Sequence, residues 1–137
     1  MSIQSIIAQV ASLEATVSGV KHAYDTADST INEFPAFINF PESGVINRTP
    51  NLRKTVHRIK MLLYVTDSVL ASAEAELRPY LVATLDVFDT HLSLNSTAAS
   101  SQIVGYKYGS LEYGGQKYLG ISFDLDVTEW IPFSFAP

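Results

Sequence analysis

Residues 116–128 read QKYLGISFDLDVT, and they carry the most regular pattern in the chain. Large apolar side chains occupy every second position from Leu119 to Val127, while Ser122, Asp124 and Asp126 lie between them. This period of two is typical of a strand that buries one face and exposes the other. We therefore expect one long, half-buried strand here, with its partners elsewhere in the chain.

The residues before this strand predict a hairpin partner. Residues 109–115 contain three glycines and suit a turn, and residues 102–108 alternate as a shorter strand. The segment from Leu92 to Ser101 is rich in Ser, Thr and Asn, so we expect a loop there.

A second long strand is predicted over residues 52–66. Its alternation gives two faces, with Ile59, Met61, Leu63 and Val65 on one and Lys54, Arg58, Lys60, Leu62 and Tyr64 on the other. Residues 34–41 predict a short aromatic strand whose prolines place it at an edge or limit its ends. Residues 42–50 contain a glycine and several polar side chains, and we expect a loop.

Two helices complete the pattern. Residues 2–24 and the stretch from about residue 67 to His91 both show apolar stripes at helical spacing. Pro79 lies inside the second stretch and predicts a kink or a short break, because proline removes a helical hydrogen bond. The polar residues 25–32 are expected to form a loop.

The element order is helix, strand, strand, helix, strand, strand. This order predicts an α+β fold with about four mostly antiparallel strands and both helices on one face of the sheet. The 137 residues suffice for one domain with one hydrophobic core. Residues 129–137 are aromatic and proline-containing without a regular pattern, so we expect an aromatic C-terminal tail.

Composition narrows the function classes. The net charge of −5 argues against a dedicated nucleic-acid binder, which needs clustered Lys and Arg. The absence of cysteine excludes disulfides, thiolate zinc sites and cysteine nucleophiles. No signal peptide or membrane span is recognisable, so we expect a soluble, cytosolic chain without membrane contact. Charged residues make up only 17% of the chain, which fits a partner-covered assembly subunit about as well as a compact monomer.

No motif for catalysis, a metal or a cofactor stands out. The three histidines are His22, His57 and His91. None of them belongs to a metal-spaced motif, and the chain has no GxSxG elbow and no phosphate-binding glycine loop. Asp124, Asp126 and Glu129 lack the glycine and distal glutamate of a calcium loop. We expect no enzymatic activity, no metal and no cofactor.

The most uneven charge feature is basic. Five of the nine Lys and Arg residues lie close together, namely Arg48, Arg53, Lys54, Arg58 and Lys60. If the last strand pairs alongside, Asp124 and Asp126 would neutralise some of them within one sheet. Alternatively, the basic stripe would meet an acidic surface on another subunit. A nucleic-acid contact is the third reading, weakened by the acidic total.

The C-terminal aromatic residues are the other interface candidates. Trp130, Phe133 and Phe135 end the chain and must dock on their own core or on a neighbour. Aromatic side chains are favoured anchors of protein interfaces.

Several stretches together resemble one family. They are VKHAY at 20–24, FPAFINFP at 34–41, RIKMLLYV at 58–65, AEAELRPYL at 73–81 and YGGQKYLGISFDL at 113–125. In this order they are similar to the tail terminator, or tail-completion, proteins of long-tailed bacteriophages with non-contractile tails. The Pro-Tyr pair at 79–80 and the Gly-Gly pair at 114–115 carry most of the resemblance.

The resemblance implies a role in virion assembly. It implies a structural protein of the virion tail or neck that is assembled in the host cytoplasm as a ring, often of six copies. Such a ring caps the tail tube, stops its growth and joins the head connector, while DNA passes only as cargo through the lumen. The implied partners are the chain itself, the tail tube protein and the connector.

Three hypotheses remain open at this point. The first is the assembly subunit, as a tail terminator or another neck or connector protein. The second is a small monomeric protein-binding module with an internally docked tail. The third is an enzyme of an unrecognised type, which predicts a deep pocket that brings a histidine together with a carboxylate or a serine.

Overall fold

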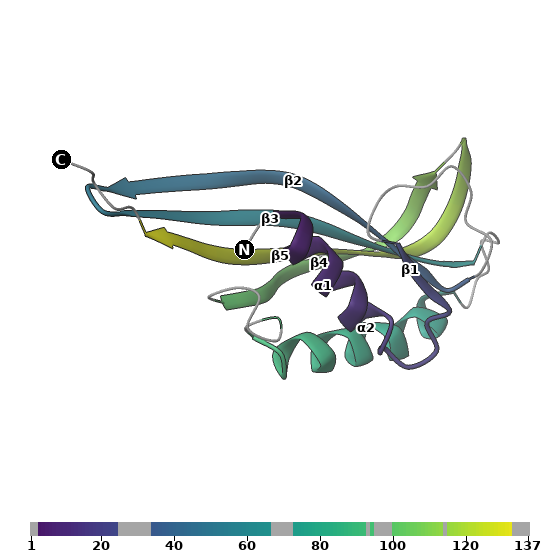
Figure 1. The fold of residues 1–137 in the computed structure, drawn as a ribbon. Helices are drawn as coiled ribbons and strands as arrows, with labels where there is room; N and C mark the ends of the chain where they lie inside the picture. The colour runs from purple at the N-terminus through teal and green to yellow at the C-terminus, as the bar shows by residue number, and fades with distance from the viewer. Residues whose placement is uncertain are drawn as a thin grey trace.

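A computed structural model of the chain describes residues 3–24, 34–66, 73–92, 94, 100–113 and 115–132. Two helices and one five-stranded sheet make up the fold (Figure 1). In chain order the elements are α1 (Ile3–Glu14), β1 (His22–Tyr24), β2 (Ala36–Thr49), β3 (Leu52–Thr66), α2 (Ala73–Asp89), β4 (Ser100–Tyr113) and β5 (Gln116–Pro132).

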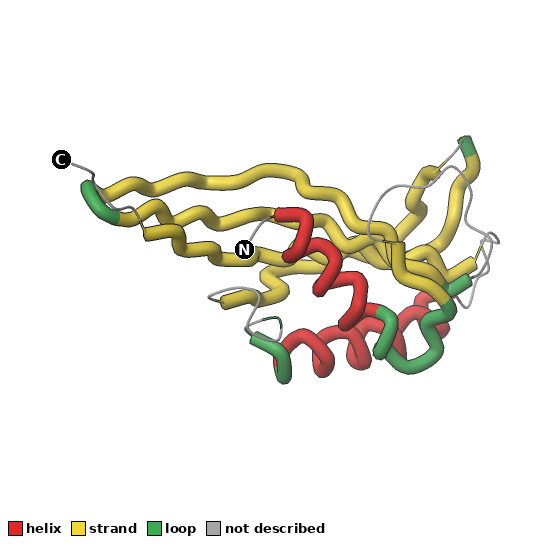
Figure 2. The backbone as a smooth tube through the Cα atoms, in the orientation of Figure 1, coloured by secondary structure: helices red, strands yellow, loops and turns green. Residues whose placement is uncertain are grey.

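The sheet has the order β1-β2-β3-β5-β4. β1 is parallel to β2, and all other neighbours are antiparallel. Both helices lie on one face, called here the helix face, and the opposite face is called the open face (Figures 1 and 2). The α+β class is confirmed, but the sheet is mixed and contains β1, which the sequence did not predict because a strand of three residues shows no alternation.

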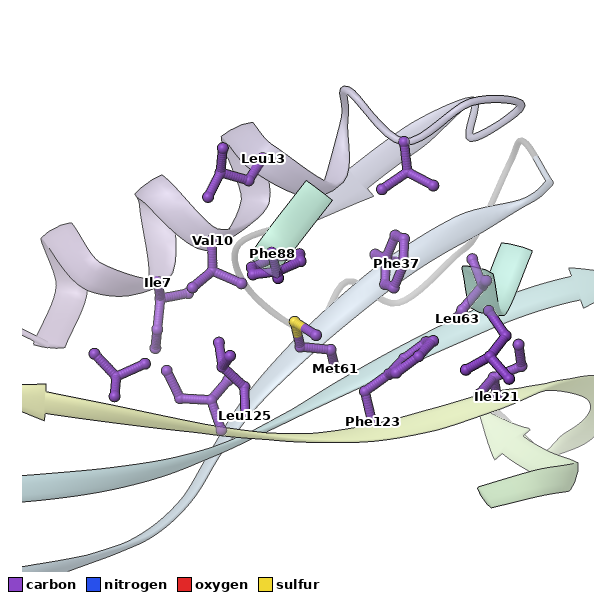
Figure 3. Packing of buried hydrophobic residues seen from close by; sticks show 14 of the residues in the cluster. Ile7, Val10, Leu13, Phe37, Met61, Leu63, Phe88, Ile121, Phe123 and Leu125 are labelled. Atoms are coloured by element: carbon purple, nitrogen blue, oxygen red, sulfur yellow. The ribbon is translucent and has the colours of Figure 1, made fainter. Parts of the chain in front are cut away.

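The main core lies between the helices and the helix face (Figure 3). Val10 of α1 and Phe88 of α2 are fully buried there against Phe37, Met61 and Phe123 from three adjacent strands. The predicted inward faces of β3 and β5 are confirmed, because their alternate apolar side chains all contribute to this core.

A second, smaller core lies on the open face. Tyr64 shares the face of its strand with Arg58 and Lys60, as predicted, yet it is only 1% exposed. It packs edge-on against Tyr118 with ring centroids 5.4 Å apart. The β4–β5 hairpin curls away from the helices at this end of the sheet (Figure 1). Gly120 permits the close approach, because a Cβ there would run into the carbonyl oxygen of Leu63 and come within 2.9 Å of Leu111 Cδ1. The curled hairpin therefore buries a patch that alternation alone marks as exposed.

At the opposite end of the sheet three strands project past both helices (Figures 1 and 2). We call this region the arm and define it as Ser43–Thr49 of β2, Leu52–Arg58 of β3 and Asp126–Pro132 of β5. The arm is continuously paired, with Thr49 opposite Leu52 at its end and Leu52 opposite Pro132. The predicted loop over 42–50 was therefore wrong: pairing with β3 keeps this segment extended despite its glycine and polar residues.

The irregular C-terminal tail was predicted to begin at residue 129, which is too early in the sequence. Residues 129–132 belong to β5, because they continue its ladder with residues 52–55 of β3. The remainder of the predicted tail, which includes Phe133 and Phe135, lies outside the described residues.

The helix boundaries differ from the prediction as well. α1 ends at Glu14 instead of residue 24, and a chain of turns follows up to Gly19, whose φ is +89°. Val17 and Val20 still pack on the main core from these turns. Their spacing in the sequence therefore continues the apolar pattern of α1 although the helix has ended.

α2 continues through Pro79 without the expected break. Leu77 and Leu81 anchor the helix to the core on both sides of the proline, and tertiary packing outweighs the missing hydrogen bond. Residues 67–72, 25–33 and most of 93–99, where further helix and loop boundaries were predicted, lie outside the described residues.

Candidate interaction surface

The open face at the base of the arm carries a charge ladder across three strands. Arg58 lies opposite Asp126 in the strand register, its Nε contacts Oδ1 of Asp126, and its Nη2 lies 3.1 Å from Oδ2. Lys60 Nζ lies 3.4 Å from Asp124 Oδ1 and 3.9 Å from Glu42 Oε2. The hydrogen bond from Arg58 to Asp126 raises the pKa of the guanidinium, which stabilises the positive charge of Arg58.

The alternatives for the five clustered basic residues were neutralisation within the sheet, contact with another subunit and contact with nucleic acid. The ladder shows neutralisation within the sheet for two of the five. Arg58 and Lys60 are neutralised within their own sheet, as expected if β5 pairs beside β3. Their role in contact with a partner stays a prediction.

The other three basic residues gather at the end of the arm. We define the tip as Asn47–Lys54, which contains Arg48, Arg53 and Lys54. Arg48 and Arg53 are direct cross-strand partners, a like-charge arrangement that is unfavourable in an isolated sheet. Within the described part of the chain no acidic side chain forms an ion pair with any of the three, and Arg53 Nε is buried without a hydrogen-bond partner.

Large apolar side chains are exposed on both faces of the arm. Val45 is 62% exposed and Trp130 is 53% exposed, and the register places both on the open face. Ile46 is 54% exposed, and its pairing with Thr55 places it on the helix face. An arm that projects with apolar side chains on both faces has the composition of an interface.

Below the tip, the helix face of the arm holds a pair that sequence reasoning missed. His57 Nε2 lies 3.3 Å from Glu129 Oε1, and Glu129 is only 4% exposed. The two come together because Thr55 pairs with Glu129 in the β3–β5 register, which places His57 diagonally across. Extending the alternation of β5 by four residues would have placed Glu129 on the buried face.

A second buried carboxyl group lies in the body of the protein. Glu14, at the end of α1, accepts a hydrogen bond of 2.6 Å from Asn39 Nδ2, which also donates to the Tyr24 carbonyl. Burial raises the pKa of Glu14 well above its usual value, and the Asn39 hydrogen bond only partly opposes this. Glu14 Oε2 and Asn39 Oδ1 are buried without partners. The charged form of Glu14 is therefore poorly accommodated.

Within the described residues, the other two histidines form no ion pair with a carboxylate. His22 is exposed in β1, and His91 Nδ1 lies 2.8 Å from the Val87 carbonyl at the end of α2. Three open depressions have volumes of about 390, 420 and 440 Å³. The described residues that line them are small or aliphatic residues, serines, Tyr80, Tyr108 and Lys107, and none of these is a histidine or a carboxylate. Among the residues that the structure describes, no group of three or more His, Asp or Glu side chains could hold a metal ion.

The sheet edges are open over long stretches. β1 pairs only with Ala36–Ile38, so the described residues place no further strand along the rest of the outer edge of β2. β4 forms the other edge of the sheet. Within the described ranges, neither helix is long and apolar enough to cross a membrane.

Comparison of the chain with protein-family models finds no match, and comparison with curated proteins finds none either.

Proposed function

We propose that this protein is a structural subunit of a larger protein assembly, and specifically a phage tail terminator that caps the tail tube as a ring. The observation that carries the proposal is the arm. It extends past the core, exposes Val45, Ile46 and Trp130, and among its described residues only Val127 at its base belongs to the main core. A projecting arm of this kind is stabilised by contact with other chains.

The resemblance of the sequence to tail terminators supports the specific role. On this proposal the partners are other copies of the chain, often six in a ring, together with the tail tube protein and the head connector. The protein would be assembled in the host cytoplasm and reside in the tail or neck of the virion. A different neck or connector protein would use the same surfaces. The exact position of the protein in the virion is therefore the more specific part of the proposal.

The test is the mass of the purified protein in solution. Light scattering over a concentration series, with and without a co-expressed tail tube protein, is expected to give a defined ring or a complex with the tube protein. A strict monomer that ignores the tube protein contradicts the proposal and favours a monomeric binding module.

The described residues 129–132 change the choice of truncation. A stop after Thr128 would remove the end of β5 and the buried Glu129, and it would damage the fold itself. A stop after Pro132 removes only residues 133–137 and tests whether Phe133 and Phe135 contribute to assembly. We expect this truncation to weaken assembly while β5 stays paired through Pro132 and the protein still unfolds cooperatively.

A further inference from the structure

The arm tip is a concentrated positive region on an otherwise acidic chain. Residues 43–56 contain Arg48, Arg53 and Lys54 and no acidic residue. Since the whole chain carries −5, the remaining residues together carry −8. A molecule with its charges separated in this way complements a second copy of itself.

One described acidic surface matches the tip in both charge and apolar character. The outer face of α2 exposes Val82, Asp86 and Asp89, which are spaced so that they share one side of the helix. Val82 is 57% exposed, comparable to Val45 and Ile46 beside the tip.

Both surfaces are electrostatically unfavourable in a single molecule. Asp86 and Asp89 lie in the last turn of α2, where the negative end of the helix dipole disfavours carboxylates, and this turn has no basic residue. Arg48 and Arg53 face each other across two strands. Contact between a tip and an α2 terminus relieves both repulsions at once.

The contact must form between two molecules. Figures 1 and 2 show the tip projecting past the ends of both helices, so it points away from α2 of its own chain. We propose that the arm tip of one copy docks on the outer face of the C-terminal half of α2 of a second copy, with Arg48 and Arg53 near Asp86 and Asp89. This inference rests on the proposed assembly function and names the surface through which the copies meet.

Charge reversal tests the contact. The tip variant is Arg48→Glu with Arg53→Glu, and the helix variant is Asp86→Lys with Asp89→Lys. Self-association of the wild type is measured by light scattering over a concentration series, at roughly 0.05 M and 0.5 M salt to vary the screening. We expect each variant alone to associate at least about tenfold more weakly than the wild type at low salt, because like charges then meet.

The mixture of the two variants is the decisive sample. In it, reversed tips meet reversed helices and native tips meet native helices, so association is expected to return to within a few-fold of the wild type. The matched control replaces Lys107 and Lys117, exposed cations of the β4–β5 hairpin, by Glu and makes the same change in net charge. This control is expected to associate as the wild type does, and its mixture with the helix variant is expected to show no rescue.

The outcomes separate this inference from the proposed function. If the wild type forms a ring and the tip variant forms it equally well, or if the mixture shows no rescue, the tip contact is wrong and the assembly role stands. If the wild type is a monomer that still captures the tube protein, the tip contact is again wrong and the assembly role stands. If the wild type is a monomer that ignores the tube protein, both are wrong.

Discussion

The body and the arm are built from the same three strands but are stabilised differently. In the body, β3 is buried on both faces, with Met61 under the helices and Tyr64 under the curled hairpin. In the arm, the same strand has Lys54 exposed on one face and a half-exposed Arg53 on the other. The pairing of β2, β3 and β5 continues through both regions, with one register shift between Pro41 and Ser43 in β2 and one between Tyr64 and Thr66 in β3. The comparison indicates that the arm beyond Val127 depends mainly on backbone pairing, while side-chain burial in the core stabilises the body.

The largest effect on this comparison is expected from Gly120→Ala. The added methyl group would collide with the Leu63 carbonyl oxygen, which belongs to a neighbouring strand and cannot move aside. We expect destabilisation by roughly 3 kcal/mol or more, or failure to fold, measured by urea denaturation. Gly105→Ala is the matched control, because its Cβ would meet only Asp124 Oδ2 at 3.7 Å. Equal stability of the two variants would contradict the tight bend at Gly120.

Removal of one large aromatic side chain from each region compares them directly. Phe123→Ala opens a cavity in the fully buried core and is expected to cost about 3–5 kcal/mol. Trp130→Ala removes a side chain that is 53% exposed on the arm, and is expected to cost about 1 kcal/mol or less in the isolated protein. In an assembly assay we expect the opposite order: Trp130→Ala should fold normally but associate more weakly than the wild type. A large loss of monomer stability in Trp130→Ala would mean that the arm shares the core.

The buried Glu14 predicts a pH dependence that belongs to the body. Its folded-state pKa is raised, so the folded protein retains a proton that the unfolded chain loses above about 4.5. Its contribution to stability is therefore complete below this unfolded value and is lost as the pH rises through the folded pKa.

Glu14→Gln removes this titration and keeps the acceptor of the Asn39 hydrogen bond. The new amide also supplies a donor beside the unpartnered Asn39 Oδ1. At neutral pH we expect stabilisation on the order of 1 kcal/mol, which shrinks as the pH is lowered toward 4.5. Denaturation midpoints of both proteins over this range measure it. Parallel curves for the two proteins would show that Glu14 does not carry the titration.

The smallest effect is expected from the exposed ladder of the arm. Arg58→Met removes the pair with Asp126 while keeping an aliphatic chain on the sheet, and solvent-exposed pairs contribute little to stability. The thermal midpoint should change less than for any substitution above. A change as large as that of Phe123→Ala would indicate that charge pairing, not backbone pairing, holds the arm together.

Sequence patterns predicted the body better than the arm, for a physical reason. Alternation of apolar and polar residues shows which side chains face a hydrophobic layer. In β3 such a layer covers residues 59–63, and in β5 it covers residues 119–127. Beyond Val127 neither face of the arm belongs to the main core, so Glu42–Thr49 and Glu129–Pro132 show no such contrast although both are strands.

Register explains what could not be predicted about the candidate surface. The sequence offered Asp124 and Asp126 as partners for the basic cluster, but which cations they neutralise depends on the β3–β5 register. A bulge between Pro41 and Ser43 then shifts β2 by one residue, which places Val45 and Ile46 on faces that a continuous alternation from Phe37 would not give them.

The central position of β3 determines how the arm responds to force. From Leu52 at the tip to Met61 in the core, β3 is flanked by ladders to β2 and to β5. A strand held on both sides cannot lengthen or slide without the rupture of many hydrogen bonds together. The arm therefore resists a pull along its strands, and such a load reaches the core where Ile59 and Met61 are buried.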